Sequence, residues 1–358
     1  MRTLILTHPL GANYGGIMQC YALKTVLENM GHEVVVIDLR QYLPYYKRII
    51  RSLMIAIGHP RYKKMKFEKM QKFIDKNFKL TSPFYNEKKL ERYVEKNNIG
   101  AVFVGSDQVW NKNFAMRYGY AYFLSFVPSK VKKVAYAASI GTTTWEYDNE
   151  QTMKISNLLY AFSGISVRED LGVEMCKSNM KITPKLVLDP TFLLSDKFYS
   201  KISSSRIIKN KYIFVYWIWN KQMIENALSS IENINQYEIV NLSMYEGNNF
   251  VSVEDWLSYI KYADIVITDS FHGCAFSIIF CKRFIYPTNE HVFDVRRASI
   301  FKMLSIDEAR IGSADYFYEY DNINRVKQEL IIEAMAYINM SLKNNSSLNF
   351  PGPKRPWQ

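Results

Sequence analysis

The sequence predicts an α/β fold of two Rossmann-like domains that face a cleft, and three observations lead to it. The chain has 358 residues, which is long for a single hydrophobic core. Short apolar runs alternate with helix-like stretches, as expected for a parallel sheet covered by helices. A polar stretch at 195–210 separates two sets of such runs, and we interpret it as a linker. We therefore expect domains at 1–200 and 201–342, with a polar tail at 343–358.

The first unit has a strand-helix-strand pattern. Residues 4–6 are apolar and read as a buried strand, and a loop with three glycines follows at 8–16. Residues 17–30 carry apolar side chains at helical spacing, and Gly31 stops that helix. A second apolar run at 33–38 completes the unit.

Further strand patterns recur along both halves of the chain. In the first half they lie at 101–104, 134–137, 164–167 and 185–188, and in the second at 212–216, 238–242, 265–267 and 283–286. Helix-like stretches separate most of them, which indicates parallel crossovers. The pattern at 323–342 predicts a closing C-terminal helix.

Composition narrows the class of protein. The formal net charge is +12, from 46 basic and 34 acidic residues, which suits an anionic partner. No run of 18 apolar residues exists, and we find no nucleic-acid motif. The N-terminal run lacks a cleavage site, and no CxxC pair or metal-ligand spacing occurs. We expect a cytoplasmic protein with free thiols, no bound metal and no nucleic-acid partner.

The segment 45–79 is rich in lysine and arginine interleaved with apolar residues. One interpretation is a basic amphipathic region that contacts an anionic membrane from the cytoplasmic face. The other is a helix that covers the sheet and presents a lysine face to solvent.

His272 is the most informative candidate residue. It follows the apolar run at 265–267 and precedes an apolar helix start at 277–280, so it is expected on a strand-to-helix turn. Ligands of parallel sheets bind at such turns, and histidine exchanges protons near neutral pH. The alternative is a hydrogen-bonded turn residue without chemistry.

The loop around Asn13, Tyr14 and Gly15 precedes the first helix. Its amides could hydrogen-bond a sugar or phosphate, or the loop could simply open the helix. After the 101–104 strand come Asp107, Gln108 and Trp110, which favour sugar binding, with the indole as a stacking surface. Capping of a short helix is the alternative.

Three arginines are candidates for binding an anion. Arg168 ends the 164–167 strand and could offer a bidentate fork to a carboxylate or phosphate, or pair with Glu169 or Asp170. Arg296 and Arg297 lie downstream of His272. Because neighbouring helical residues do not share a face, we expect only one of them to face the cleft.

Several of these segments, in order, resemble the polysaccharide pyruvyl transferase family. The matching segments are 13–16 with 31–38, 105–110, 135–141, 166–169, 188–191 and 268–273. The resemblance implies a GT-B-like pair of Rossmann domains. It also implies transfer from phosphoenolpyruvate, a co-substrate rather than a bound cofactor, to a glycan of a surface or capsular polysaccharide precursor. The acceptor could be linked to a lipid pyrophosphate, and the product would be a pyruvate ketal.

The resemblance also suggests a role for each candidate residue. His272 would be the general acid. The donor would be held by Arg168, Ser270, Arg296 and Arg297, and the acceptor by Asn13, Tyr14, Gly15, Asp107, Gln108 and Trp110. One departure is Ser270, which stands where the family pattern carries a donor-binding arginine. A GT-B-type glycosyltransferase that uses a nucleotide-sugar and a non-catalytic glycan-binding protein are the alternatives.

Overall fold

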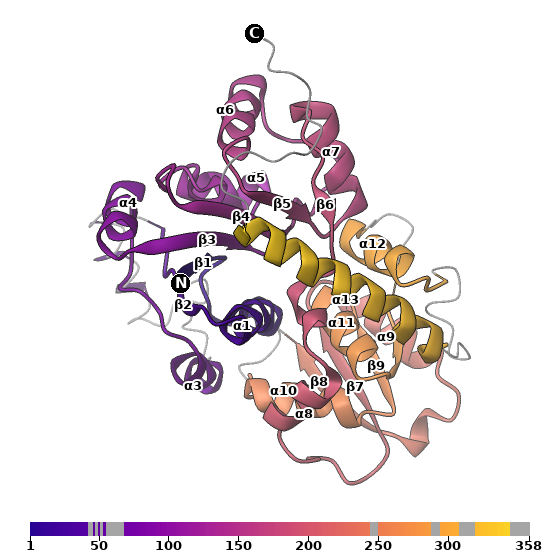
Figure 1. The fold of residues 1–358 in the computed structure, drawn as a ribbon. Coiled ribbons are helices and arrows are strands. Elements are labelled where there is room, and N and C mark those ends of the chain that lie inside the picture. The colour runs from indigo at the N-terminus through magenta and orange to yellow at the C-terminus, as the bar shows by residue number, and fades with distance from the viewer. Residues whose placement is uncertain are drawn as a thin grey trace.

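The computed structural model describes residues 1–41, 46, 49–50, 53–54, 68–243, 250–287, 294–307 and 319–343. Within them the chain forms two parallel sheets covered by helices (Figure 1). This confirms the predicted α/β class and the two Rossmann-like units of a GT-B-like fold. The predicted domain boundaries stay a prediction.

The first sheet has six strands in the order β2-β1-β3-β4-β5-β6. Their bounds are β1 (Arg2–Leu6), β2 (Glu33–Val36), β3 (Ile99–Gly105), β4 (Lys132–Ala138), β5 (Gly164–Val167) and β6 (Lys185–Leu186). All five pairings are parallel. Each strand falls on an apolar run because both faces of the sheet are covered.

The second sheet has four strands in the order β10-β9-β7-β8, again with parallel pairings. The strands are β7 (Tyr212–Trp217), β8 (Glu238–Ser243), β9 (Ile265–Thr268) and β10 (Arg283–Ile285). The edge strand β8 is largely exposed over its first four residues and buried at its last two, whereas β7 and β9 are buried throughout.

Helices cover both sheets. The α-helices are α1 (Tyr14–Asn29), α3 (Glu68–Asn77), α4 (Glu87–Lys96), α5 (Lys112–Ala115), α6 (Asn149–Leu159), α7 (Asp170–Met180), α8 (Asp196–Ile202), α9 (Lys221–Ser229), α10 (Val253–Tyr262), α11 (Phe271–Ile279), α12 (Val295–Met303) and α13 (Tyr320–Lys343). Short 3₁₀ helices include η2 (Met116–Tyr118), η3 (Ala121–Phe123) and η4 (Pro190–Leu193).

Two helix starts and the linker differ from the sequence prediction. Helix α1 begins at Tyr14 rather than at 17, because the Asn13 side chain accepts a hydrogen bond from the Gly16 amide and caps it. Helix α11 begins at Phe271, so His272 lies in the first helical turn. The predicted linker contains a helix, α8, whose Ser195 cap accepts from the Phe198 amide.

The two sheets are joined by a continuous apolar cluster that contains residues from both halves of the chain. Tyr14 of α1 is fully buried and stacks on Trp256 of α10, with ring centroids 5.1 Å apart. Its hydroxyl donates to the Val251 carbonyl at 2.9 Å. The first turn of α1 is therefore anchored in the second half of the molecule.

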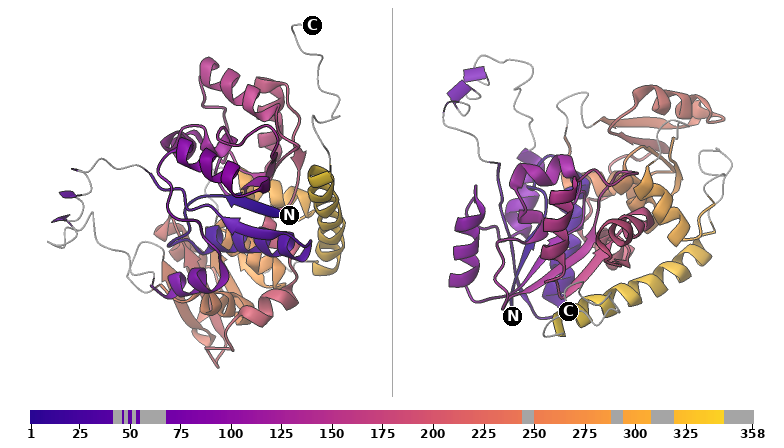
Figure 2. Two further views of the ribbon diagram at one scale, coloured as in Figure 1. Left: turned by 60° about the vertical axis from the view of Figure 1, so that its left-hand side comes forward. Right: turned by 90° about the horizontal axis from the view of Figure 1, so that it is seen from above.

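The C-terminal helix α13 returns to the first sheet and runs along one side of both units (Figures 1 and 2). Near its end, the Tyr337 hydroxyl donates to the Ala135 carbonyl of β4 at 2.9 Å. Gly164 of β5 leaves room for Ser341, since a Cβ at 164 would overlap the Ser341 hydroxyl.

The basic segment 45–79 falls partly outside the described residues. The described part of this segment includes α3, whose Met70, Phe73 and Ile74 are buried against the core. Ile49, Ile50 and Leu53 are exposed. Among the residues that the structure describes, no helix is long and apolar enough to cross a membrane.

Candidate functional site

The candidate site lies where the carboxyl ends of the two sheets meet. In the first sheet β1 lies between β2 and β3, and in the second β7 lies between β8 and β9. Each order reverses at these central strands, and such switch points are where parallel sheets bind ligands. The loops after β1 and β3 therefore approach the turn after β9, which carries His272.

Arg168 leaves the end of β5 and is almost completely buried. Its Nη1 donates to Asp189 Oδ2 at 2.7 Å, and its Nη2 lies 3.5 Å from Asp107 Oδ1. Its Nε lies 3.5 Å from Glu169, whereas Asp170 pairs with Lys302 instead. Burial alone would lower the pKa of Arg168, but the surrounding carboxylates raise it, so the guanidinium stays charged.

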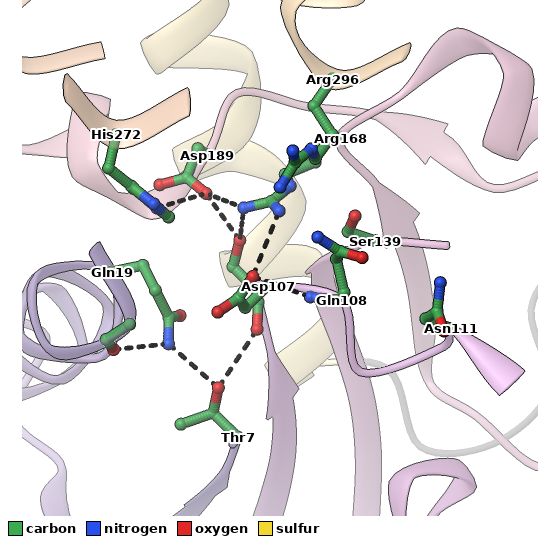
Figure 3. Close-up of polar contacts among 12 residues, drawn as sticks. Thr7, Gln19, Asp107, Gln108, Asn111, Ser139, Arg168, Asp189, His272 and Arg296 are labelled. Atoms are coloured by element: carbon green, nitrogen blue, oxygen red, sulfur yellow. Dashed lines mark hydrogen bonds and ion pairs between the residues drawn. The ribbon is translucent and has the colours of Figure 1, made fainter. Parts of the chain in front are cut away.

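Asp189 was not among the predicted site residues, although it stands at the centre of the cluster (Figure 3). It caps η4 through its Oδ1, which accepts from the Thr191 amide at 3.0 Å and hydroxyl at 2.8 Å. Its Oδ2 accepts from Arg168 and from Ser106 Oγ at 2.7 Å. An aspartate followed by proline at the end of a predicted strand was the available sequence signal.

The pKa of Asp189 lies well below its usual range. Burial acts to raise that pKa, but interactions with the nearby His272 ring, the Arg168 guanidinium and the Ser106 hydroxyl outweigh it. Asp189 is therefore a carboxylate at neutral pH.

His272 comes from the second half of the chain and points into this cluster. Its side chain is 9% exposed, and its Nε2 lies 3.7 Å from Asp189 Oδ2. That nitrogen is buried and has no hydrogen-bond partner among the residues that the structure describes. Ser270 caps α11 by accepting from the Gly273 amide, which fixes the turn that presents the ring.

Gly15 of α1 packs directly on the His272 ring. A Cβ at position 15 would overlap the imidazole around Nδ1. The first turns of α1 and α11 therefore meet, and the positive ends of both helix dipoles lie at the site. Of the predicted acceptor group, Gly15 thus contacts the proposed acid itself.

Asp107 lies between the two sheets with a left-handed backbone, φ +74°. Its carboxylate accepts from the Gln108 amide at 2.9 Å. Burial acts to raise the pKa of Asp107, but electrostatic interactions with His8, Arg168, His272 and Arg296 lower it overall. Four groups that can carry positive charge thus surround one carboxylate.

His8 was also missed by the sequence reasoning. Its Nδ1 lies 3.3 Å from the Tyr122 hydroxyl, at the end of β1. Burial lowers the pKa of His8, so the neutral ring is favoured near pH 7. A histidine two residues past an apolar strand was the signal that could have indicated it.

The paired arginines separate as expected for adjacent helical residues. Arg296 binds Asp294 through Nε at 3.0 Å and Nη2 at 3.1 Å, and lies 6.0 Å from the Phe271 ring. Arg297 is buried, with its guanidinium 5.0 Å from the Tyr286 ring. Arg296 is therefore the one that faces the cluster.

Two predicted acceptor residues lie in the core. Trp110 is 1% exposed, and its indole donates to the Tyr122 carbonyl at 3.1 Å. It stacks on Phe123, so the interpretation of Trp110 as a sugar-stacking surface is wrong. Tyr14 is closed off by Trp256 in the same way. Asn13 is exposed, and Gln108 is half-buried with its side chain over Gly141.

These features define a two-unit α/β protein with a GT-B-like fold and a charged site between its units. The model of the family described as polysaccharide pyruvyl transferase matches residues 13–291. The chain therefore belongs to the polysaccharide pyruvyl transferase family, which is a family of transferases.

Solved structures with similar folds include a UDP-GlcNAc 2-epimerase from Neisseria meningitidis bound to UDP-GlcNAc. It is 11% identical, with a TM-score of 0.49, and the match covers 95% of this chain and 94% of that one. A glycosyltransferase from Rickettsia africae is 11% identical with a TM-score of 0.43, covering 95% and 96%. No curated protein matches the chain significantly.

Proposed function

We propose that this protein transfers the enolpyruvyl carbons of phosphoenolpyruvate to two hydroxyls of a sugar in a surface or capsular polysaccharide precursor. The observation that carries the proposal is the contact of Arg168 and His272 with one oxygen of Asp189. A fixed guanidinium and an imidazole then lie side by side where the two sheets meet. That arrangement can hold an anionic donor and deliver a proton to it.

The reaction balances through proton transfers. His272 gives a proton to the methylene carbon of the donor, which becomes a methyl group and leaves positive charge on the central carbon. One sugar hydroxyl attacks that carbon, phosphate leaves, and the second hydroxyl closes the ketal. Of the two hydroxyl protons, one restores His272 and the other leaves with the phosphate.

In this proposal the donor is held mainly by Arg168 and Arg296. Ser270 stands at the position where an arginine is expected, and it caps α11. Arg296 supplies the missing positive charge, because it approaches both Phe271 and Asp107. Lys282 is a poor substitute, since its charged neighbours are Asp264 and Arg206 rather than the site residues.

The acceptor is assigned to the side of the first sheet. Asn13, Asp107 and Gln108 offer amide and carboxylate groups next to Arg168 and His272, with Gly15 closing the edge. We infer that the acceptor sugar carries a lipid pyrophosphate, since the chain has a formal net charge of +12.

A lipid-linked acceptor places the protein at the cytoplasmic face of a membrane. Ile49, Ile50 and Leu53 are 43%, 46% and 59% exposed in the basic segment 45–79. Apolar side chains among lysines and arginines suit peripheral binding to anionic lipid.

The first experiment is thermal unfolding with and without phosphoenolpyruvate, using a nucleotide-sugar panel as the comparison. A ligand at a hundred times its Kd stabilises the folded state by about 2.7 kcal/mol. We expect a raised Tm with phosphoenolpyruvate, lost in His272→Gln and Arg168→Lys, and release of phosphate with a pyruvylated glycan as product. A shift with a nucleotide-sugar alone would contradict the proposal.

A further inference from the structure

Asp189 belongs to neither the donor-binding nor the acceptor-binding residues proposed above. Its carboxylate is nevertheless buried and fixed by hydrogen bonds on both oxygens. Its Oδ1 is occupied by the amide and hydroxyl of Thr191, at 3.0 and 2.8 Å. The side chain is 0% exposed. These two bonds fix the carboxylate plane, so that Oδ2 points toward the meeting edge of the two sheets.

Three side chains that follow the ends of three separate strands converge on that second oxygen. Arg168 Nη1 lies 2.7 Å from it, Ser106 Oγ 2.7 Å, and His272 Nε2 3.7 Å. Figure 3 shows Arg168 and His272 approaching Asp189 from opposite sides. Asp189 therefore lies directly between the proposed donor-binding cation and the proposed acid.

The other carboxylates of the cluster do not share this placement. Asp107 and Glu169 each lie 3.5 Å from Arg168. Within the described part of the chain, Asp189 is the one carboxylate within 4 Å of both Arg168 and His272. Glu169 is instead hydrogen-bonded to Ser139 and the Ile140 amide, away from the histidine.

We infer that Asp189 is a positioning residue that holds the Arg168 guanidinium and the His272 imidazole at a fixed separation. The inference rests on the proposed function, because it assigns roles to the same two side chains. The carboxylate orients the ring through Nε2 and limits the rotation of the guanidinium. Donor binding and proton delivery are thereby coupled, although Asp189 contacts neither substrate.

This coupling predicts a split between binding and turnover. Asp189→Asn keeps the shape of the side chain and an acceptor for Thr191, but removes the charge that competes with the donor for Arg168. We expect the Kd for phosphoenolpyruvate to stay equal or fall, while kcat falls about 100-fold through misplacement of His272. Glu169→Gln is the matched control, since it removes a buried charge beside Arg168 without contacting His272. We expect it to retain kcat within a few-fold.

A second readout does not depend on activity. The five histidines can be labelled at the ring carbon Cε1, and the His272 NMR signal is assigned by its loss in His272→Gln. We expect Asp189→Asn to shift that signal and Glu169→Gln to leave it in place. The Tm of both variants is measured alongside.

The outcomes separate the two proposals. A wild-type protein that neither binds phosphoenolpyruvate nor releases phosphate from it would refute the proposed function. An unshifted His272 signal in Asp189→Asn overturns the positioning role whatever the wild-type activity. Parallel losses of affinity, kcat and Tm would also overturn it, because they indicate a residue needed only for folding.

Discussion

His272 lies against Gly15 so closely that position 15 has no room for a side chain. The two residues come from different halves of the chain, and at their contact the first turns of α1 and α11 meet. The ring is thus held on one side by a backbone and on the other by the Asp189 carboxylate. Sterics and charge both determine where the imidazole points.

Gly15→Ala should therefore displace His272. We expect kcat to fall about 100-fold, as for other displacements near 1 Å. Overpacking lowers the free energy of unfolding by about 1–3 kcal/mol, and the higher helix propensity of alanine raises it by up to about 1 kcal/mol. Stability should therefore change less than activity. Gly11→Ala is the control, because a Cβ there meets nothing within 4 Å. Equal activity of the two variants would contradict the contact.

Arg296→Gln should weaken donor binding. A hydrogen bond to a charged group contributes about 1.5–3 kcal/mol, so the Kd for phosphoenolpyruvate should rise at least tenfold by calorimetry. Arg325→Gln on the exposed side of α13 is the control. An unchanged Kd in Arg296→Gln would show that Arg296 does not replace the arginine expected at position 270. It would then favour a different donor.

The buried aspartates should make the free energy of unfolding fall at low pH. Burial acts to raise the pKa of Asp294, but Arg296 and Tyr286 lower it to about 2. A lowered folded pKa gives stability that is fully present above the unfolded value, about 4, and is lost as pH falls toward 2. Asp189 and Asp107 act in the same direction. Burial raises the pKa of Glu169, so that group acts in the opposite direction.

Asp294→Asn tests this dependence. The charge interaction contributes about 2 kcal/mol at pH 7, and the variant should lose that much free energy of unfolding. Its urea-unfolding midpoint should also fall less steeply than that of the wild type below about pH 4. Parallel curves for the two proteins would show that Asp294 does not supply the acid sensitivity.

Membrane contact can be tested on the exposed apolar residues. Ile50→Ser with Leu53→Ser should reduce co-sedimentation with phosphatidylserine vesicles several-fold, because each loses apolar area available to the lipid. Activity on a water-soluble acceptor should be unchanged. Ile332→Ser on α13, which is 61% exposed, is the matched control. Equal sedimentation of all three proteins would remove the membrane proposal.

The fold was predictable because the strands are buried on both faces. The run at 164–167 matches β5, and the run at 265–267 falls one residue short of β9. Strand ends also located Arg168 and His272, because polar residues after buried strands converge at one edge. Ser270 and Asn13 proved to be helix caps, which their residue types allow.

Asp189 and Trp110 show which features the sequence pattern alone does not predict, because both depend on side-chain contacts made in the folded protein. The role of Asp189 depends on three side chains reaching one oxygen, two from just after β3 and β5 and one from α11. The packing of the two halves sets this convergence. The Trp110 side chain points into the core because its indole N–H donates a hydrogen bond to the Tyr122 carbonyl and its ring stacks on Phe123. Side-chain direction in a loop is set by such partners rather than by sequence spacing.

The stacking of Tyr14 on Trp256 has a consequence for how such enzymes can be recombined. A chimera that joined the first half of this chain to the second half of a relative would pair one ring with a foreign surface. It would also remove the Val251 carbonyl that accepts the hydrogen bond of the Tyr14 hydroxyl. The halves of this protein are therefore not interchangeable modules, and an exchanged half must carry its matching aromatic partner with it.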